Sequence, residues 1–140
     1  MIRRKNPVGR SIALLLLVGG LLAGCGEKNF EPRIAPDYSL PLLDGSGHVV
    51  MSETKGDVVY VGFWASWCEP CRQELPYLAQ LYKRHREEGF QVMAINVDED
   101  LQAAKQFAAE YDLPFTVLRD ADKEVAKRYR VPGYPTHFLV

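Results

Sequence analysis

The sequence has few cysteines, almost no excess of charge and no repeated or low-complexity segment. Three cysteines in 140 residues are too few for a disulfide-stabilised scaffold. A net charge of −1 and a pI near 6.3 exclude the strongly basic face of a general nucleic-acid binder. The length and the charged fraction of 25% are those of a single folded domain. The odd number of cysteines indicates that one of them has a separate role.

The amino terminus carries four basic residues before the first acidic one, and an apolar run follows at residues 11–22. A basic start, a short apolar stretch and small residues form the layout of a secretory signal. The run is shorter than the roughly 20 residues of a membrane-spanning helix, and its glycines are unfavourable inside a helix. We therefore predict a signal peptide at residues 1–24, in preference to a signal anchor or a buried helix.

Residues 22–25, Leu-Ala-Gly-Cys, resemble the lipobox of bacterial lipoproteins. In that family the cysteine is lipidated on sulfur and becomes the first mature residue, so the resemblance implies lipidation of Cys25. This assignment accounts for the odd cysteine. Removal of residues 1–24 takes away four positive charges and leaves 116 residues with a net charge of −5. We expect residues 25–37 to form the lipidated cysteine and tether, and residues 38–140 to form the folded domain.

Strand-like and helix-like segments alternate along the domain. Two short apolar segments, 38–40 and 48–51, flank a turn-rich spacer and predict a hairpin. Four apolar, β-branched segments predict strands, at 58–64, 91–97, 116–118 and 136–140. Three amphipathic segments predict helices, beginning near Cys68, Asp100 and Asp122. The alternation predicts an α/β fold with parallel strand pairs.

Cys68 and Cys71 lie where the expected buried strand at 58–64 meets the next helix. Two thiols three positions apart on a first helical turn share one face and can form a disulfide. The unpaired N–H groups and the helix dipole there favour the nucleophilic thiolate form of Cys68. A structural zinc site needs a second ligand pair, which the scattered histidines do not supply. An inert disulfide closing so short a loop adds little stability.

The residues around this dithiol resemble the thioredoxin superfamily. The fuller pattern resembles its extracytoplasmic, membrane-anchored thiol–disulfide oxidoreductases of the ResA/TlpA type, which are related to the AhpC/TSA peroxiredoxins. The resemblance covers about residues 36–140. It rests on four segments: Phe63-Trp-Ala-Ser-Trp-Cys-Glu-Pro-Cys71, Glu74-Leu-Pro76, Ala94-Ile-Asn-Val97 and Val131-Pro-Gly-Tyr-Pro-Thr136.

The resemblance implies a thioredoxin fold, in which helices flank a mixed central sheet, with an amino-terminal hairpin and an inserted helix and strand at about residues 100–118. Family members continue beyond the strand at 136–140 with a partner strand and a carboxy-terminal helix. We therefore expect the last strand and helix of the fold to be missing from the sequence. An isolated 1–140 chain would then leave a sheet edge and an apolar face open, which favours aggregation.

The resemblance also implies the roles of individual residues. Cys68 would attack a substrate disulfide, and Cys71 would resolve the mixed disulfide, so that the pair forms the redox-active disulfide. Pro135 would follow a cis peptide bond that places backbone beside the dithiol. The residues implied to contact the substrate are Trp67, Glu69, Pro70, Tyr134, Pro135 and Thr136. For Trp67, simple packing is an equal alternative.

Two carboxylates match acidic positions of the family. Glu74 would be an active-site acid that tunes the cysteines and moves protons, and the alternative is a solvated helix carboxylate. Glu99 would be a further proton-handling group, and the alternative is helix capping. Ionised Glu69 and Glu74 oppose a thiolate nearby, which makes the dithiol more reducing and favours a reductase over an oxidase.

The resemblance implies no cofactor and no nucleic-acid partner. It implies a protein disulfide as substrate, with the haem-attachment disulfide of apocytochrome c as that of the best-matched members. It also implies a membrane dithiol as electron donor and a lipid-anchored position on the outer side of the bacterial cell membrane.

Three alternatives belong to other classes. A copper-delivery protein of the Sco-related type would bind Cu(I) through Cys68, Cys71 and His137. That family usually spaces its thiols CxxxC, and His137 is expected to face away on its strand. A peroxidase would keep its cysteine in a Pro/Thr-rich loop, which is not the pattern here. A purely adhesive lipoprotein gives no reason for the dithiol.

Overall fold

The computed structural model describes residues 34–54 and 58–140. The signal peptide predicted for residues 1–24 and the lipidation site at Cys25 lie outside the described residues, as does most of the predicted tether. No helix in the described part is both long and apolar enough to cross a membrane. The elements of this part are β1 Ser39–Pro41, β2 His48–Val50, η1 Met51–Glu53, β3 Val58–Trp64, α2 Glu69–His85, η2 Arg86–Glu88, β4 Phe90–Asn96, α3 Leu101–Glu110, β5 Thr116–Arg119, α4 Glu124–Arg128 and β6 Thr136–Leu139.

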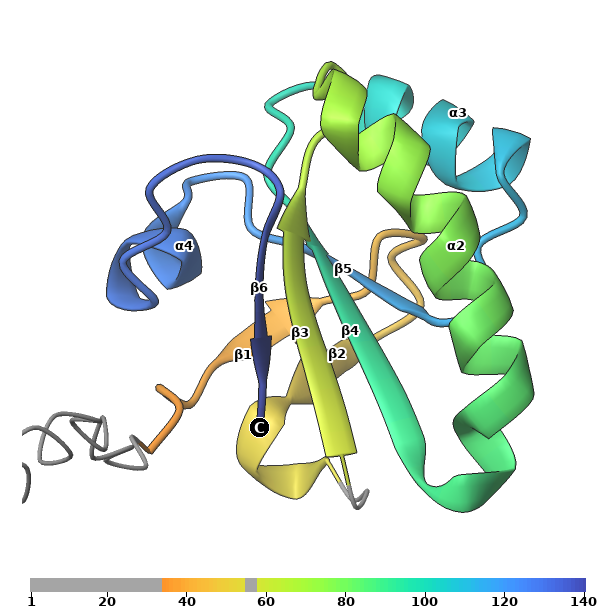
Figure 1. Cartoon of the computed structure of the whole chain (residues 1–140). Helices are drawn as coiled ribbons and strands as arrows, with labels where there is room; N and C mark the ends of the chain where they lie inside the picture. Colours follow the sequence, from red (N-terminus) through yellow and green to blue (C-terminus); the bar gives the residue numbers. More distant parts are fainter. Residues whose placement is uncertain (1–33, 55–57) are drawn as a thin grey trace, which may run out of the picture. The chain divides into compact units, whose positions relative to one another are not determined.

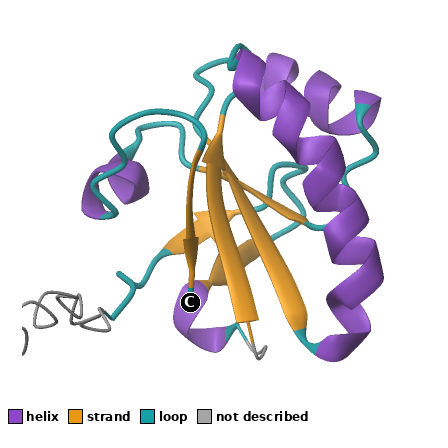
Figure 2. Cartoon of the chain, viewed as in Figure 1, coloured by secondary structure: helices purple, strands orange, loops and turns teal. Residues whose placement is uncertain are grey.

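The central sheet has four strands in the order β5-β4-β3-β6 (Figure 2). β3 runs parallel to β4, β4 runs parallel to β5, and β6 runs antiparallel to β3. The sheet is therefore mixed and contains the parallel pairs that the alternation of elements predicts. The expected hairpin is also present, because β1 pairs antiparallel with β2.

Alternate side chains of β3 point to opposite faces of the sheet, as in any strand. On one face Phe63 packs against Tyr129, which follows α4, and against Phe138 of β6. On the other face Trp64 packs against Phe107 of α3. Figure 1 shows α2 and α3 together on one side of the sheet and α4 on the other. The two buried layers hold β3 in the middle of the domain.

The predicted helices are present, but the third begins differently from the sequence-based expectation. Asp122 was expected to cap it, whereas Lys123 stands at the cap position in a left-handed conformation, with φ of 61°. The buried Asp120 instead accepts hydrogen bonds from the backbone N–H groups of Val125 and Ala126, at 3.1 and 2.8 Å. Asp120 directly follows β5 and is therefore nearer the sheet than Asp122, so its carboxylate can bind the N–H groups of the first turn of α4.

The first and last residues of the described domain differ in how they contact the rest of it. Tyr129 donates a hydrogen bond to the carbonyl of Pro36, and Asp37 accepts two from Ser52. At the other end β6 is an edge strand of the described sheet, and Leu139 is 70% exposed. The expected tendency of this edge to aggregate stays a prediction.

Candidate redox site

Cys68 and Cys71 form a disulfide at the amino-terminal end of α2, with their Cα atoms 5.3 Å apart. Cys68 is the N-cap of the helix, and its Sγ accepts a 3.3 Å hydrogen bond from the Cys71 N–H. Pro70 occupies the first turn of the helix, where a backbone N–H has no helical carbonyl to bond to, so the missing N–H of proline costs no hydrogen bond. Both cysteines are buried, Cys71 at 1% exposure and Cys68 at 4%. The Cys68 sulfur is thus placed at a helix amino terminus, where backbone N–H groups stabilise a thiolate.

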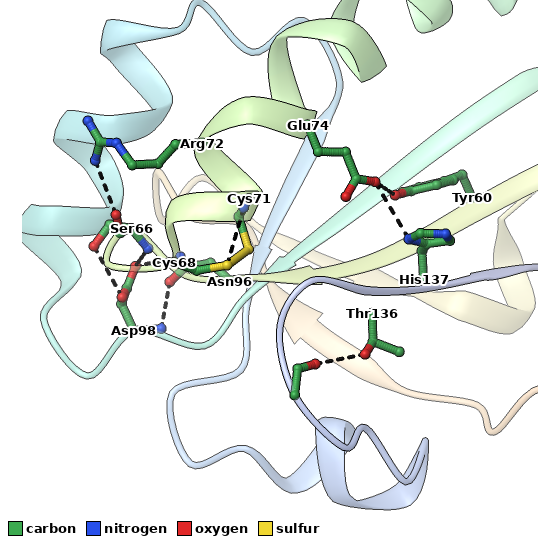
Figure 3. Close-up of a disulfide and its surroundings, with 11 residues drawn as sticks. Tyr60, Ser66, Cys68, Cys71, Arg72, Glu74, Asn96, Asp98, Thr136 and His137 are labelled. Atoms are coloured by element: carbon green, nitrogen blue, oxygen red, sulfur yellow. Dashed lines mark hydrogen bonds and ion pairs between the residues drawn. A yellow bond between two sulfur atoms is a disulfide. The ribbon is translucent and has the colours of Figure 1, made fainter.

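The loop that leads into α2 is anchored to the end of β4 by a buried carboxylate. Asp98 accepts hydrogen bonds from the Ser66 N–H at 2.9 Å and from the Asn96 side-chain amide at 2.7 Å (Figure 3). The Asp98 N–H donates in turn to Asn96 Oδ1. The carboxyl ends of two neighbouring parallel strands, β3 and β4, meet here, so a short polar network fixes the loop before Cys68.

Arg72 holds the first turn of α2 against α3. Its guanidinium donates to the Ser66 carbonyl at 3.1 Å (Figure 3). The guanidinium carbon also lies 5.1 Å from the ring centroid of Phe107. A second ring, that of Tyr111, lies 5.8 Å away. Arg72 follows Cys71 directly, so this contact restrains the helical turn that carries the dithiol.

The expected substrate-contact residues lie around the disulfide. The Tyr134–Pro135 peptide bond is cis, as the family resemblance implied. Pro135 and Thr136 line a narrow cavity that Cys71 also lines. Trp67 is 65% exposed and meets Tyr134 edge to face, with ring centroids 5.8 Å apart. Glu69 is exposed in the first turn of α2. These positions are compatible with substrate contact, which stays a prediction.

Glu74 lines the same cavity as Cys71, one helical turn further along α2. Its Oε1 accepts a 2.8 Å hydrogen bond from the Tyr60 hydroxyl and lies 3.5 Å from Nδ1 of His137 (Figure 3). Burial raises the pKa of Tyr60 above its usual range, and the hydrogen bond to Glu74 raises it further. Tyr60 therefore remains a hydrogen-bond donor to the carboxylate at physiological pH. Sequence reasoning missed Tyr60 because its contact joins β3 to α2.

Glu99 lies in a different environment from Glu74. Its carboxylate pairs with Lys123 at 3.2 Å, and its side chain is 85% exposed. Its backbone carbonyl accepts a hydrogen bond from Arg119. Asp100, its neighbour, caps α3 through the N–H of Gln102, as the capping alternative expected. The proton-handling role of Glu99 stays a prediction.

The copper alternative required Cys68, Cys71 and His137 to form one metal site. In residues 34–54 and 58–140, no group of three or more His, Cys, Asp or Glu side chains is placed to hold a metal ion. His137 contacts Glu74 and stacks on Tyr60. The expectation that His137 faces away on its strand is therefore wrong, because its imidazole lies against Glu74 of α2 and Tyr60 of β3.

Comparisons with known proteins agree with this geometry. Residues 33–140 match the model of the AhpC/TSA family. The thiol–disulfide oxidoreductase ResA of Bacillus cereus is 36% identical over 145 residues, which cover 98% of this chain and 83% of that protein. ResA of Bacillus subtilis is 38% identical over 114 residues, covering 81% of this chain and 63% of that protein.

Two solved structures are similar in fold and in sequence. A protein from Chlorobium tepidum, described as a thiol:disulfide interchange protein DsbE, has a TM-score of 0.71 and 42% identity, covering 76% of this chain and 74% of that one. A secreted disulfide oxidoreductase of Mycobacterium tuberculosis has a TM-score of 0.65 and 28% identity, covering 74% and 81%.

Proposed function

Because this chain belongs to the AhpC/TSA family and is a thiol–disulfide oxidoreductase, we propose that it works as a reductase of extracytoplasmic protein disulfides. The observation that supports reduction over oxidation of the substrate is the position of the Glu74 carboxylate, which lines the cavity beside Cys71. A nearby negative charge disfavours a thiolate and so destabilises the reduced enzyme relative to the disulfide. Such a couple donates electrons more readily.

The chemistry uses the two sulfurs in sequence. The Cys68 thiolate attacks a substrate disulfide, forms a mixed disulfide and releases one substrate sulfur. Cys71 then attacks Cys68 Sγ, which forms the disulfide seen in the structure and releases the second substrate sulfur. The exposed Trp67 and the backbone around cis-Pro135 flank the place where the substrate chain would lie.

The place of action and the partners extend the same proposal. A chain with a signal peptide at residues 1–24 and a lipid on Cys25 acts at the outer side of the cell membrane, close to a membrane dithiol that re-reduces it. One structural relative is itself described as secreted. The apocytochrome c disulfide is the substrate class we propose, with Glu99 as an auxiliary proton-handling residue. The negative charge expected for the mature chain suits a basic partner.

The reduction potential tests the direction. We expect the protein, equilibrated in thiol–disulfide buffers, to have a potential closer to that of thioredoxin, about −270 mV, than to that of the oxidant DsbA, about −120 mV. The fraction of Cys68–Cys71 disulfide is measured by thiol alkylation. All measurements use a protein that carries Cys25→Ser, so that no third thiol reacts. A potential near that of DsbA would contradict the proposal.

A further inference from the structure

Tyr60 and His137 meet at Glu74, and the two-sulfur chemistry described above does not use either of them. Tyr60 comes from β3 and His137 from the neighbouring strand β6. Their rings stack with centroids 5.4 Å apart and an interplanar angle of 22°. Both contact the same carboxylate oxygen, Oε1 of Glu74, at 2.8 and 3.5 Å (Figure 3). We call Tyr60, Glu74 and His137 the relay cluster.

The sheet makes room for the relay cluster through one small residue. Gly62 of β3 pairs with Ala94 on one side and with His137 on the other. A Cβ atom at Gly62 would lie only 2.5 Å from Cε1 of Tyr60. Glycine therefore allows the Tyr60 ring to lie along β3 beyond its own position, where its hydroxyl reaches Glu74.

The cluster connects the buried dithiol to solvent. Cys71 is 1% exposed, whereas the side chains of Glu74 and His137 are 33% and 53% exposed. Glu74 shares the cavity of Cys71, and His137, the more exposed of the two partners, contacts Glu74 from outside the residues that line this cavity. In Figure 3 the Glu74 carboxylate lies between the dithiol and the pair formed by Tyr60 and His137.

We propose that the relay cluster moves the Cys71 proton to solvent when the mixed disulfide is resolved; this deepens the proposed function and rests on it. Cys71 Sγ gives its proton to Glu74 and forms the S–S bond to Cys68 Sγ. The bond between Cys68 and the substrate breaks, and the substrate sulfur leaves as a thiolate that takes a proton from water. Two electrons pass from the dithiol to the substrate. His137 accepts the proton from Glu74 and releases it, and Tyr60 is a positioning residue for the carboxylate.

The pH dependence follows from the groups that face His137. Glu74 of α2 and Tyr60 of β3 contact its ring, and its neighbours on β6, Thr136 and Phe138, do not titrate. Burial holds the pKa of Tyr60 above its usual range, so it stays protonated. Only a neutral imidazole ring accepts a proton, so His137 can serve the relay only in that form. Resolution through the relay should therefore accelerate as pH rises.

The test separates attack from resolution in one stopped-flow experiment. The reduced protein, with Cys25→Ser, reacts with an aromatic disulfide that releases a coloured thiol. The first release reports attack by Cys68, and the second reports resolution by Cys71. In His137→Gln we expect the second phase to be about tenfold slower at pH 7 to 8, less than the roughly 100-fold effect of losing a general base because Glu74 remains, and to rise less steeply with pH than in the wild type. The first phase should change less than about twofold.

Two further variants complete the test. Tyr60→Phe keeps the ring and removes the hydroxyl, so it should slow the second phase and preserve the pH-dependent rise. His48→Gln, in the hairpin, should leave both phases unchanged. The inference is overturned if His137→Gln keeps the wild-type rate and pH profile of the second phase while both thiols are released. That result would leave a reducing potential intact, so the failure of the inference and the failure of the proposed function are distinguishable.

Discussion

At the scale of single residues, the site is decided by what stands beside each sulfur. The Cys68 sulfur faces the N–H groups at the start of α2, which favour its thiolate. The Cys71 sulfur shares its cavity with the Glu74 carboxylate, which opposes a second charge. Neighbouring groups thus give two chemically identical side chains different tasks.

The substitution Glu74→Gln tests this division. Removing the negative charge should lower the thiol pKa of the reduced protein, because like charge no longer opposes the thiolate. It should also slow resolution by about 10- to 100-fold, since the proton acceptor is lost. Thiol absorbance against pH and the two-phase exchange assay measure the two effects. Glu88→Gln, at the far end of the same helical region, is the matched control. Unchanged thiol pKa values together with unchanged exchange rates would refute the proton-handling role of Glu74.

At the scale of elements, the helix and loop ends that surround the site depend on buried carboxylates. Asp98 fixes the loop before α2 through Ser66, and Asp120 binds the first N–H groups of α4. Each carboxylate follows a parallel strand, β4 for Asp98 and β5 for Asp120. Because parallel strands end at the same edge of a sheet, both carboxylates support the edge where the dithiol lies.

The effect of Asp120 on stability depends on pH. Asp120→Ala removes the acceptor of two helical N–H groups and should cost about 1 to 2 kcal/mol of unfolding free energy. Burial raises the pKa of Asp120 above its usual range, so the folded state favours the protonated form. The stability of the wild type relative to Asp120→Asn should therefore fall as pH rises above about 4.

Urea unfolding at a series of pH values measures this effect. Asp122→Asn is the comparison, because that exposed side chain accepts a hydrogen bond from the Glu124 N–H and adds less than burial does to the raised pKa of Asp120. Its effect should remain within about 0.5 kcal/mol. A larger loss for the Asp122 variant than for the Asp120 variants would show that the sequence-based cap was the correct one.

At the scale of the whole molecule, one face of the domain gathers the groups that we propose to meet a substrate. The dithiol and the exposed Trp67 come from one segment and the cis-Pro135 turn from another, far along the chain, and both lie at one end of the sheet. The relay cluster lies behind them, between α2 and β6. In this proposal the domain separates the surface for substrate binding from the path for protons.

Substrate capture tests the function of the whole chain. Cys71→Ala removes the resolving thiol, so the protein should hold its target as a mixed disulfide through Cys68. The adducts formed by the chain with its signal peptide, expressed in a bacterium, are separated under non-reducing conditions and identified. A Cys68→Ala, Cys71→Ala double variant is the control for nonspecific adducts. Capture of the same proteins by both variants would contradict a dedicated reductase.

Local sequence patterns were enough to predict much of this fold. The apolar run at 58–64, the cysteines beside it and the helical periodicity after them predict β3, the dithiol and α2 because each pattern expresses nearest-neighbour geometry. The resemblance to a known family added the cis-Pro135 bond, which no local pattern indicates. The cap of α4 was assigned only in part, because Asp122 accepts the N–H of Glu124 whereas the buried Asp120 accepts the next two.

The sequence by itself thus determined the redox chemistry, since a CxxC pair at a strand–helix junction places two sulfurs on one helical turn. Only the tertiary structure decided what surrounds them. Tyr60 and His137 lie 77 positions apart in the chain, and both reach Glu74 only because β3 pairs with β6 beneath α2. The reason is physical: covalent spacing fixes contacts within one element, whereas contacts between elements depend on the register of strands and on the space that a residue such as Gly62 leaves open.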